Sequence, residues 1–237
     1  MTEQAHDDVA HHHADVSGGW LRAGVFGAMD GLVTNIALVA GVGGGGAGRT
    51  TIILTGMAGL VAGAFSMALG EFASIGTQND AVAHEVSVER AEIARYPDGE
   101  MAELADTYER MGLTRTTAEA VAREVHADPE RAVKVHITQE LGIDPDDQPS
   151  PWTAAVSSFI AFAIGGILPL VSFLAGSSSL VVALVIGAVG LFVAGAVTSR
   201  FTTRVWWLAG LRQLLFGAIA AGATYLVGMA IGVSAAG

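Results

Sequence analysis

The sequence predicts an all-α integral membrane protein with five transmembrane helices and a helical insert between the second and the third. Three observations carry this prediction. Charged residues make up only 15% of the 237 residues and the mean hydropathy is +0.51, which is too apolar for an ordinary soluble domain. The apolar residues fall into five blocks, each long enough for the roughly 20 residues that a helix needs to cross a bilayer. Most acidic residues lie between the second and third blocks.

The blocks divide the chain into four expected parts. Residues 1–19 are a polar, His-rich tail that we expect to be disordered. Residues 20–73 hold the first two spans, residues 74–150 form the acidic insert, and residues 151–237 hold the last three spans. The spans themselves are expected near residues 21–43, 50–73, 152–175, 178–199 and 208–233.

Glycine patterns support individual spans. The run Gly43–Gly46 predicts a tight turn at the end of the first span. Glycines four residues apart let helices approach closely in lipid. Such pairs occur in the first, second and fifth spans, as Gly27 with Gly31, Gly59 with Gly63, and Gly228 with Gly232. The first block lacks the basic start and the small-residue cleavage pattern of a signal peptide, so we expect it to be a span.

The insert is expected to begin with two helices. The helix of the second span continues past the membrane to Arg95, where Pro97-Asp98-Gly99 stops it. The next helix then runs over about 98–111.

Two further helices complete the insert. Thr116 with Glu119 matches a capping box and opens a helix that ends near residue 126. Asp128 as N-cap, with Pro129 at the first helical position, opens a last helix that Gly142 closes.

Charge restricts both the class of partner and the orientation. Of the 23 acidic residues, 17 lie between Asp80 and Asp147, and the net charge is −11. Such a surface argues against nucleic acid and favours cations. Among the short loops only Arg49 lies on the side opposite to the other basic residues, so the N-terminus and the insert are expected in the cytosol. There is no Cys, which excludes disulfides and thiolate metal sites.

Carboxylates in the insert recur at spacings that place them on common helix faces. Glu89 with Glu92, and Glu100 with Glu103, are each three residues apart. Antiparallel helices joined at the Pro97 turn would bring the two pairs together, and carboxylates at close range repel one another unless a cation lies between them. A solvated acidic face is the alternative. The candidate metal ligands in the insert are Glu85, Glu89, Glu92, Glu100, Glu103, His136 and Glu140.

Three residues in the first two spans are candidates for a transport site. An ionised Asp30 in the middle of a span costs about 2.5–3.5 kcal/mol, so it should face a cavity, an ion or a partner. The structural alternative is a hydrogen bond to Asn35 or to a neighbouring helix. Met67 is either apolar filler or a thioether ligand, which beside a carboxylate suits a borderline metal. Glu71, one turn further, is either an ion or proton relay or an interfacial charge.

Together these residues resemble the vacuolar iron transporter family, which includes the yeast vacuolar calcium/manganese transporter and the nodulin-21-like proteins, and the chain looks like a prokaryotic-type member. The resemblance covers nearly the whole chain after residue 20. It rests on Asp30-Gly31-Leu32, Ala62 to Gly70, Glu85 to Glu103, Gln139-Glu140-Leu141-Gly142 and Gly165 to Leu170.

The resemblance implies a five-span homodimer that exports Fe²⁺, and often Mn²⁺, from the cytosol in exchange for protons. It implies a membrane metal site at Asp30 and Met67. The cytosolic metal site that it implies consists of Glu89, Glu92, Glu100, Glu103 and Glu140. No prosthetic group is expected; the metal is the substrate, with Co²⁺ and Zn²⁺ as further candidates. The expected membrane is a bacterial plasma membrane.

The chain departs from the family pattern at two places. His136 and Ile137 stand where the plant transporters have adjacent Met residues, and Asn35 stands where the eukaryotic pattern has Pro. Two other functions stay open. A membrane-anchored ferritin-like iron oxidase would need Glu-x-x-His motifs, which are absent before His84, His126 and His136. A metal sensor or buffer that does not transport would explain the insert but not an acid inside a span.

Overall fold

The computed structural model describes residues 19–201 and 203–235, and every regular element in these ranges is a helix. Of the expected tail at residues 1–19, residues 1–18 lie outside the described residues, and Gly19 begins the first helix. Five helices are long and apolar enough to cross a membrane, so the all-α class and the five spans are confirmed. The five spans are Trp20–Gly44, Arg49–Arg95, Pro151–Leu174, Leu180–Thr198 and Trp206–Gly232.

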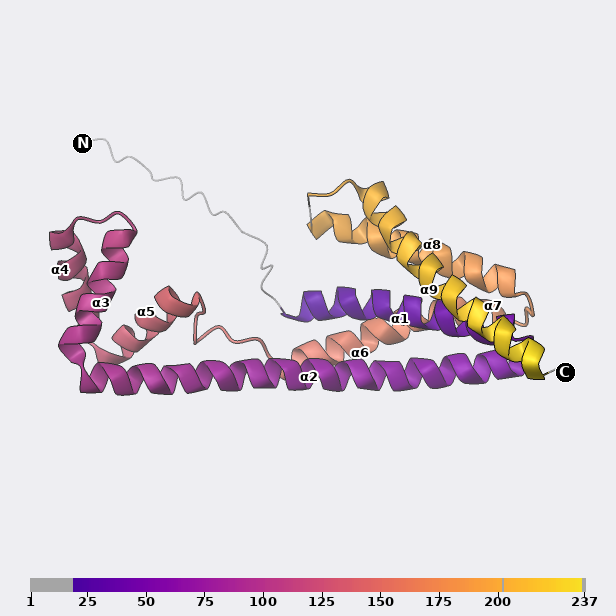
Figure 1. Cartoon of the computed structure of the whole chain (residues 1–237), viewed down its shortest axis with the longest axis horizontal. Coiled ribbons are helices and arrows are strands. Elements are labelled where there is room, and N and C mark those ends of the chain that lie inside the picture. Colours follow the sequence, from indigo (N-terminus) through magenta and orange to yellow (C-terminus); the bar gives the residue numbers. More distant parts are fainter. Residues whose placement is uncertain (1–18, 202, 236–237) are drawn as a thin grey trace, which may run out of the picture.

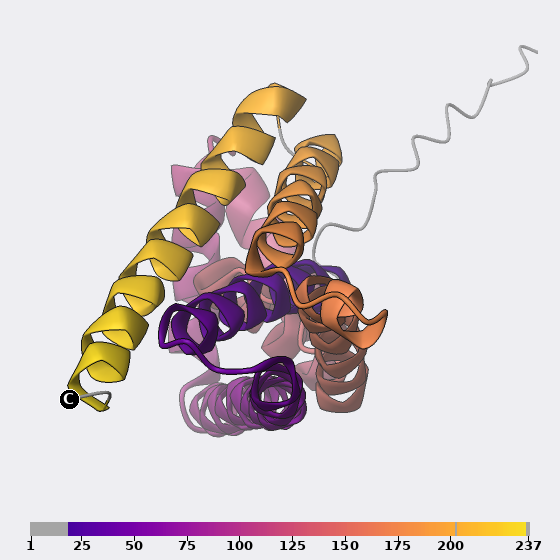
Figure 2. The same ribbon diagram turned by 90° about the vertical axis from the view of Figure 1, so that its right-hand side faces the viewer.

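Helix α1 (Gly19–Gly44) is the centre of the membrane-length bundle. It packs against α2 (Arg49–Arg95), α6 (Pro151–Ile167), α8 (Leu180–Thr198) and α9 (Trp206–Ala235). Figure 2 shows α1 between α2 on one side and α8 with α9 on the other. Because α1 has neighbours on several sides, it is the helix on which a polar side chain is most strongly constrained.

Close backbone approach explains two of the predicted glycines. A Cβ atom at Gly31 would lie 2.2 Å from the carbonyl oxygen of Phe162 on α6. A Cβ atom at Gly228 would lie 1.8 Å from the carbonyl oxygen of Gly41, where α9 crosses α1. Apolar side chains gain little by leaving lipid for another helix, so such close van der Waals contact is what holds these helices together.

The third span is not a single helix, in contrast to the continuous segment expected over 152–175. Helix α6 ends at Ile167 and is followed by a 3₁₀ turn, η1 (Leu168–Leu170), and by the short helix α7 (Val171–Leu174). Pro169 lies in the 3₁₀ turn, and proline lacks the N–H that an α-helix needs at an interior position. The loop after α1 agrees with the expected turn, because α1 ends at Gly44 and Gly46 adopts φ +81°.

Helix α2 runs without a break through 47 residues, which is about 70 Å at 1.5 Å per residue. The hydrocarbon core of a bilayer is about 30 Å thick, so a large part of α2 must lie outside it. Figure 1 shows that the first part of α2 runs beside α1 and α6, and that its far end carries three shorter helices. The predicted continuation of this helix to Arg95 is confirmed.

The three shorter helices are α3 (Pro97–Arg110), α4 (Arg115–His126) and α5 (Pro129–Leu141). They enclose two small apolar clusters, one with Ile93 and Ile137 between α2 and α5, and one with Leu104 and Ala118 between α3 and α4. The antiparallel arrangement expected at the Pro97 turn is wrong. Helix α3 leaves the end of α2 steeply, and it is α5 that packs along α2 (Figure 1).

The predicted helix ends of this region are mostly confirmed. The Asp128 side chain accepts hydrogen bonds from two backbone N–H groups at the start of α5, and Gly142 ends α5 in the left-handed conformation. The capping box at Thr116 is wrong, because Thr114 caps α4 by accepting from the Thr117 N–H. The Glu119 side chain instead pairs with that of Arg115.

Candidate metal centre

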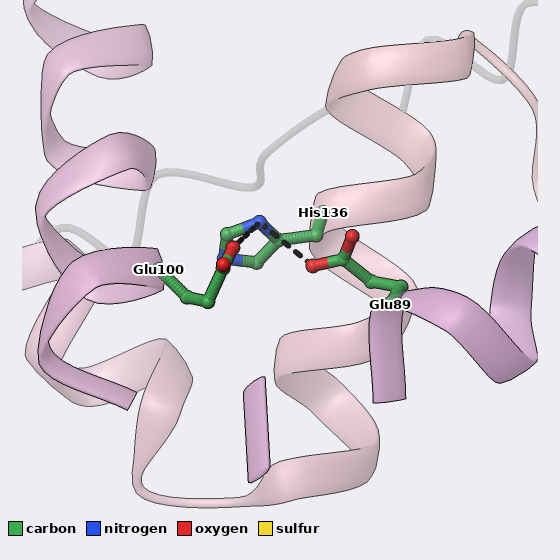
Figure 3. A group of neighbouring side chains, drawn as sticks. All are labelled: Glu89, Glu100 and His136. Atoms are coloured by element: carbon green, nitrogen blue, oxygen red, sulfur yellow. Dashed lines mark ion pairs between the residues drawn. The ribbon is translucent and has the colours of Figure 1, made fainter. Parts of the chain in front are cut away.

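Three helices of the insert each place one potential metal ligand at the same point. The ligand atoms of Glu89 on α2, Glu100 on α3 and His136 on α5 all lie within 4.8 Å of one another. The Nδ1 atom of His136 lies 3.1 Å from Oε1 of Glu89 and 3.9 Å from Oε2 of Glu100 (Figure 3). We refer to Glu89, Glu100 and His136 as the cage.

The helix faces explain why these polar groups are buried. On α2 the buried positions include Val82, Glu89 and Ile93, which lie on one side of the helix because they are seven and four residues apart. On α5 the imidazole of His136 lies beside the buried Val133 and Ile137. The sequence therefore places a carboxylate and an imidazole at positions that would otherwise hold core side chains.

Burial and mutual repulsion make the cage a poor place for two free carboxylates. The side chains of Glu89 and Glu100 are 6% and 14% exposed, and that of His136 is 1% exposed. Burial, and then the neighbouring carboxylates, raise the pKa of Glu89 to about 7. Burial and Glu103 also raise the pKa of Glu100. A bound divalent cation would remove this repulsion.

One oxygen of the cage lacks a hydrogen bond. The Oε1 atom of Glu89 is buried and has no hydrogen-bond partner, although Nδ1 of His136 is close to it. A buried carboxylate oxygen without a donor is costly in an apolar environment. Oε1 of Glu89 and Nδ1 of His136 lie close enough together to serve as two ligands of one ion. The donor set of two carboxylates and an imidazole therefore fits a divalent metal.

The other predicted ligands surround the cage at increasing distance. Glu140 contacts it directly, since its Oε1 atom lies 3.3 Å from Nδ1 of His136, and its side chain is 41% exposed. Glu92 and Glu103 are exposed and act on the cage through their charge, because both contribute to the raised pKa of Glu89. Glu85 is exposed on α2, and among the described residues no interaction links it to the cage.

Sequence reasoning missed His126. Its Nε2 atom lies 3.0 Å from Nε2 of His136, on the side of that ring away from the carboxylates, and the two rings meet edge to face. His126 is the last residue of α4, and a short turn at Ala127 and Asp128 leads into α5. That short connection, with a His at each side of it, is the signal that would have indicated the contact.

The membrane candidates are arranged differently. Asp30 on α1 is partly buried, and its side chain hydrogen-bonds Thr34 on the same helix. Among the described residues no ion pair or hydrogen bond joins Asp30 to another helix. The alternative partner Asn35 is wrong, because its amide donates to the Gly166 carbonyl oxygen of α6 at 2.6 Å. Met67 is partly buried on α2.

Glu71 is the one membrane candidate with a charged partner. Its Oε2 atom lies 3.0 Å from Nη2 of Arg22, and this ion pair joins α2 to α1. The Glu71 side chain is 11% exposed, whereas that of Arg22 is 63% exposed. The pair lies at the same end of the bundle as the insert, so it separates the cage from the middle of the spans.

Five helices are long and apolar enough to cross a membrane, and a buried carboxylate–imidazole cage that could hold a metal ion lies beyond one end of them. The model of the VIT family matches residues 21–229, and the chain belongs to this family. The predicted family resemblance is therefore confirmed.

Named relatives agree with this assignment. A "Vacuolar iron transporter" of Acanthamoeba castellanii is 35% identical over 190 residues, which are 75% of this chain and 69% of the relative. A "Vacuolar iron transporter 1" of Eucalyptus grandis is 29% identical over 91% of this chain and 88% of its own length. The protein of the same name in Oryza sativa subsp. japonica is 28% identical over 98% of this chain and 94% of its own length. The chain is therefore a transporter and not an enzyme, and the ferritin-like oxidase alternative is set aside.

Proposed function

We propose that the protein exports divalent transition metal, Fe²⁺ first and also Mn²⁺, from the cytosol in exchange for protons. The observation that carries this proposal is the cage, in a chain whose relatives are named for iron. Two carboxylates balance the charge of a divalent ion. The imidazole nitrogen favours Fe²⁺, Co²⁺ or Zn²⁺ over Ca²⁺ and Mg²⁺, which prefer oxygen ligands.

The cage is the collection site in this proposal. Its ligands lie in the insert, which extends from the bundle on the long α2 helix, and the distribution of Lys and Arg favours a cytosolic position for it. Because burial raises the pKa of Glu89 to about 7, part of this carboxyl is protonated near neutral pH, and metal binding would release that proton. Collection is then already coupled to proton release on the side where metal is taken up.

The translocation site is Asp30 and Met67 from two copies of the chain. A single buried carboxylate cannot neutralise a divalent ion, and Asp30 has no partner on another helix of its own chain among the described residues. A homodimer with α1 near its two-fold axis would supply a second carboxylate and a second thioether. Metal and protons would compete for the same two carboxylates, which is the simplest physical basis for exchange.

Between the two sites the ion passes Glu71. Metal that leaves the cage would compete with Arg22 for this carboxylate, so Glu71 would be a transient binding position on the path. The proposed membrane is a bacterial plasma membrane, with the N-terminus and the insert in the cytosol. Export from that compartment would lower the cytosolic metal concentration.

Proteoliposomes with the insert on the outside test the proposal. An acidic lumen should drive Fe²⁺ uptake under reducing conditions, and a dye inside should report proton loss from the lumen. Asp30→Asn should stop both fluxes while the detergent-solubilised variant still binds metal at the cage. Asp80→Asn removes an exposed carboxylate outside both sites and serves as the control. Unchanged fluxes in Asp30→Asn would refute the mechanism, and metal binding without uptake by the wild type would favour the buffer.

A further inference from the structure

We propose that His126 is a positioning residue that holds the His136 imidazole in the tautomer able to bind metal. This inference rests on the proposed function of the cage as a metal collection site. His126 lies outside the cage, and it would affect metal binding only through its contact with His136.

The two nitrogens of His136 face different surroundings. Nδ1 faces carboxylate oxygens, those of Glu89, Glu140 and Glu100 at 3.1, 3.3 and 3.9 Å. Nε2 faces Nε2 of His126 at 3.0 Å. The ring itself is 1% exposed, so water does not replace either contact. The proton of a neutral imidazole must therefore go to one of these two sides.

The carboxylates alone favour a proton on Nδ1 of His136, which is the nitrogen that should bind metal. Carboxylates accept hydrogen bonds and cannot donate them once ionised, so by themselves they stabilise a proton on Nδ1 of His136. A proton there blocks the lone pair that would bind metal. The metal-binding tautomer carries its proton on Nε2, and that N–H is buried and needs an acceptor. Among the described residues, Nε2 of His126 is the atom placed to accept it.

His126 is free to act as that acceptor. Among the described residues its ring makes no second hydrogen bond, and it borders an open pocket of about 510 Å³ with Met101, Pro129 and Val133. Its own proton can therefore stay on Nδ1 without conflict with a neighbouring side chain. Edge-to-face packing, with ring planes at 79° and centroids 5.2 Å apart, aims the two Nε2 atoms at one another.

A His ligand of a metal usually donates its second N–H to a fixed partner, and removal of that partner costs about 10–100-fold in metal affinity. Here the partner is a second His.

The test uses the full chain in detergent, with Zn²⁺ as a diamagnetic probe. Selective ¹⁵N labelling of His should show His136 bound through Nδ1 with its proton on Nε2. A competing chromophoric chelator measures the affinity. His126→Leu should weaken Zn²⁺ binding by about 10–100-fold. His126→Gln should retain most of it, because the Gln side-chain oxygen can take the place of Nε2 as acceptor.

Two comparisons separate positioning from a general loss of structure. His84→Leu removes an exposed His of α2 away from the cage and should bind Zn²⁺ like the wild type. If His126→Leu does not fold, His126→Asn against His126→Gln decides, because the Asn amide is too short to reach His136. Equal affinity in that pair would overturn the inference.

The remaining outcomes distinguish a failure of the His126 inference from a failure of the proposed collection site. Wild-type affinity in a folded His126→Leu variant, or direct zinc ligation by His126, would overturn the inference and leave the collection site standing. A wild-type protein that binds no Zn²⁺, or binds it without His136, would overturn the collection site itself.

Discussion

The cage and Asp30 differ in how much of a binding site one copy of the chain supplies. In the insert, three helices bring two carboxylates and an imidazole within 4.8 Å, and a fourth helix adds His126 behind them. In the bundle, Asp30 has Thr34 of its own helix as its side-chain partner. A collection site can thus form in each copy of the chain, whereas a translocation site needs ligands from elsewhere, which we propose to be a second copy.

The difference also separates two kinds of polar group. The cage gathers like charges that are unstable together without a cation. Two polar groups of the spans instead pair with a complementary group of another helix: Asn35 donates to the Gly166 carbonyl oxygen, and Glu71 pairs with Arg22. Asp30 differs from these two groups, because its side-chain partner Thr34 lies on its own helix, and we therefore place the proposed translocation site there.

Mixed dimers should show whether the membrane site needs two copies of the chain. If Asp30 from two copies forms one site, membranes that contain wild-type and Asp30→Asn chains in random pairs should transport in proportion to the square of the wild-type fraction. Equal amounts would leave about a quarter of the transport, because a single carboxylate cannot neutralise the ion. Proteoliposome uptake at known mixing ratios measures this. A linear dependence would mean that each chain transports alone.

Loss of one cage carboxylate should have the largest effect on metal binding. Glu89→Gln should weaken Mn²⁺ binding by at least about 100-fold, since a direct ligand matters more than the partner of a ligand. Titration of the detergent-solubilised chain checks this, with Asp80→Asn as the control on the same helix. Retained affinity in Glu89→Gln would remove Glu89 from the cage.

Stability should depend on pH in the insert. The pKa of Glu89 is raised from 4.5 to about 7, so the folded state holds this proton more tightly than the unfolded state. The resulting stabilisation is fully present below pH 4.5 and is lost as the pH rises through about 7. The metal-free melting temperature should fall over this range, and the increase caused by Mn²⁺ should grow. Glu89→Gln should flatten both trends; an equally steep variant would assign them to other groups.

Loss of the exposed carboxylates around the cage, Glu92 and Glu103, should have the smallest effect on metal binding. Glu92→Gln and Glu103→Gln should weaken metal binding by at most about fivefold, the equivalent of about 1 kcal/mol for an exposed charge. The effect should decrease with added salt, because exposed charges are screened. Titrations at low and high ionic strength measure it. A salt-independent loss as large as that of Glu89→Gln would make either residue a direct ligand.

Local patterns in the sequence were enough to predict the helices. Apolar blocks, Asp128 with Pro129, and Gly142 act through neighbouring backbone groups, so their effects do not depend on the rest of the fold. The 3₁₀ turn at Pro169 was missed because hydropathy alone does not register a missing N–H. The pattern at Thr116 was misleading because Thr114, two residues earlier, also offers a hydroxyl to a backbone N–H, and the Glu119 side chain pairs with Arg115.

The site could be predicted only in part, because long-range contacts decide which side chains meet in it. Helix spacing was enough to identify Glu89 and Glu100 as candidate ligands. It did not show that these two are inside the cage whereas Glu92 and Glu103 are exposed. That difference depends on α5 packing along α2, which the sequence does not show directly. His126 was missed for the same reason, because its role depends on which nitrogen of His136 faces it.

The central claim is that collection and translocation are separate steps at separate sites. Initial rates of Fe²⁺ uptake into proteoliposomes, measured against Fe²⁺ concentration under a fixed pH gradient, test it most directly. Glu89→Gln should raise KM and keep the maximal rate, whereas Asp30→Asn should lose the maximal rate. A normal rate in Asp30→Asn, or the same loss of maximal rate in both variants, would contradict two separate sites.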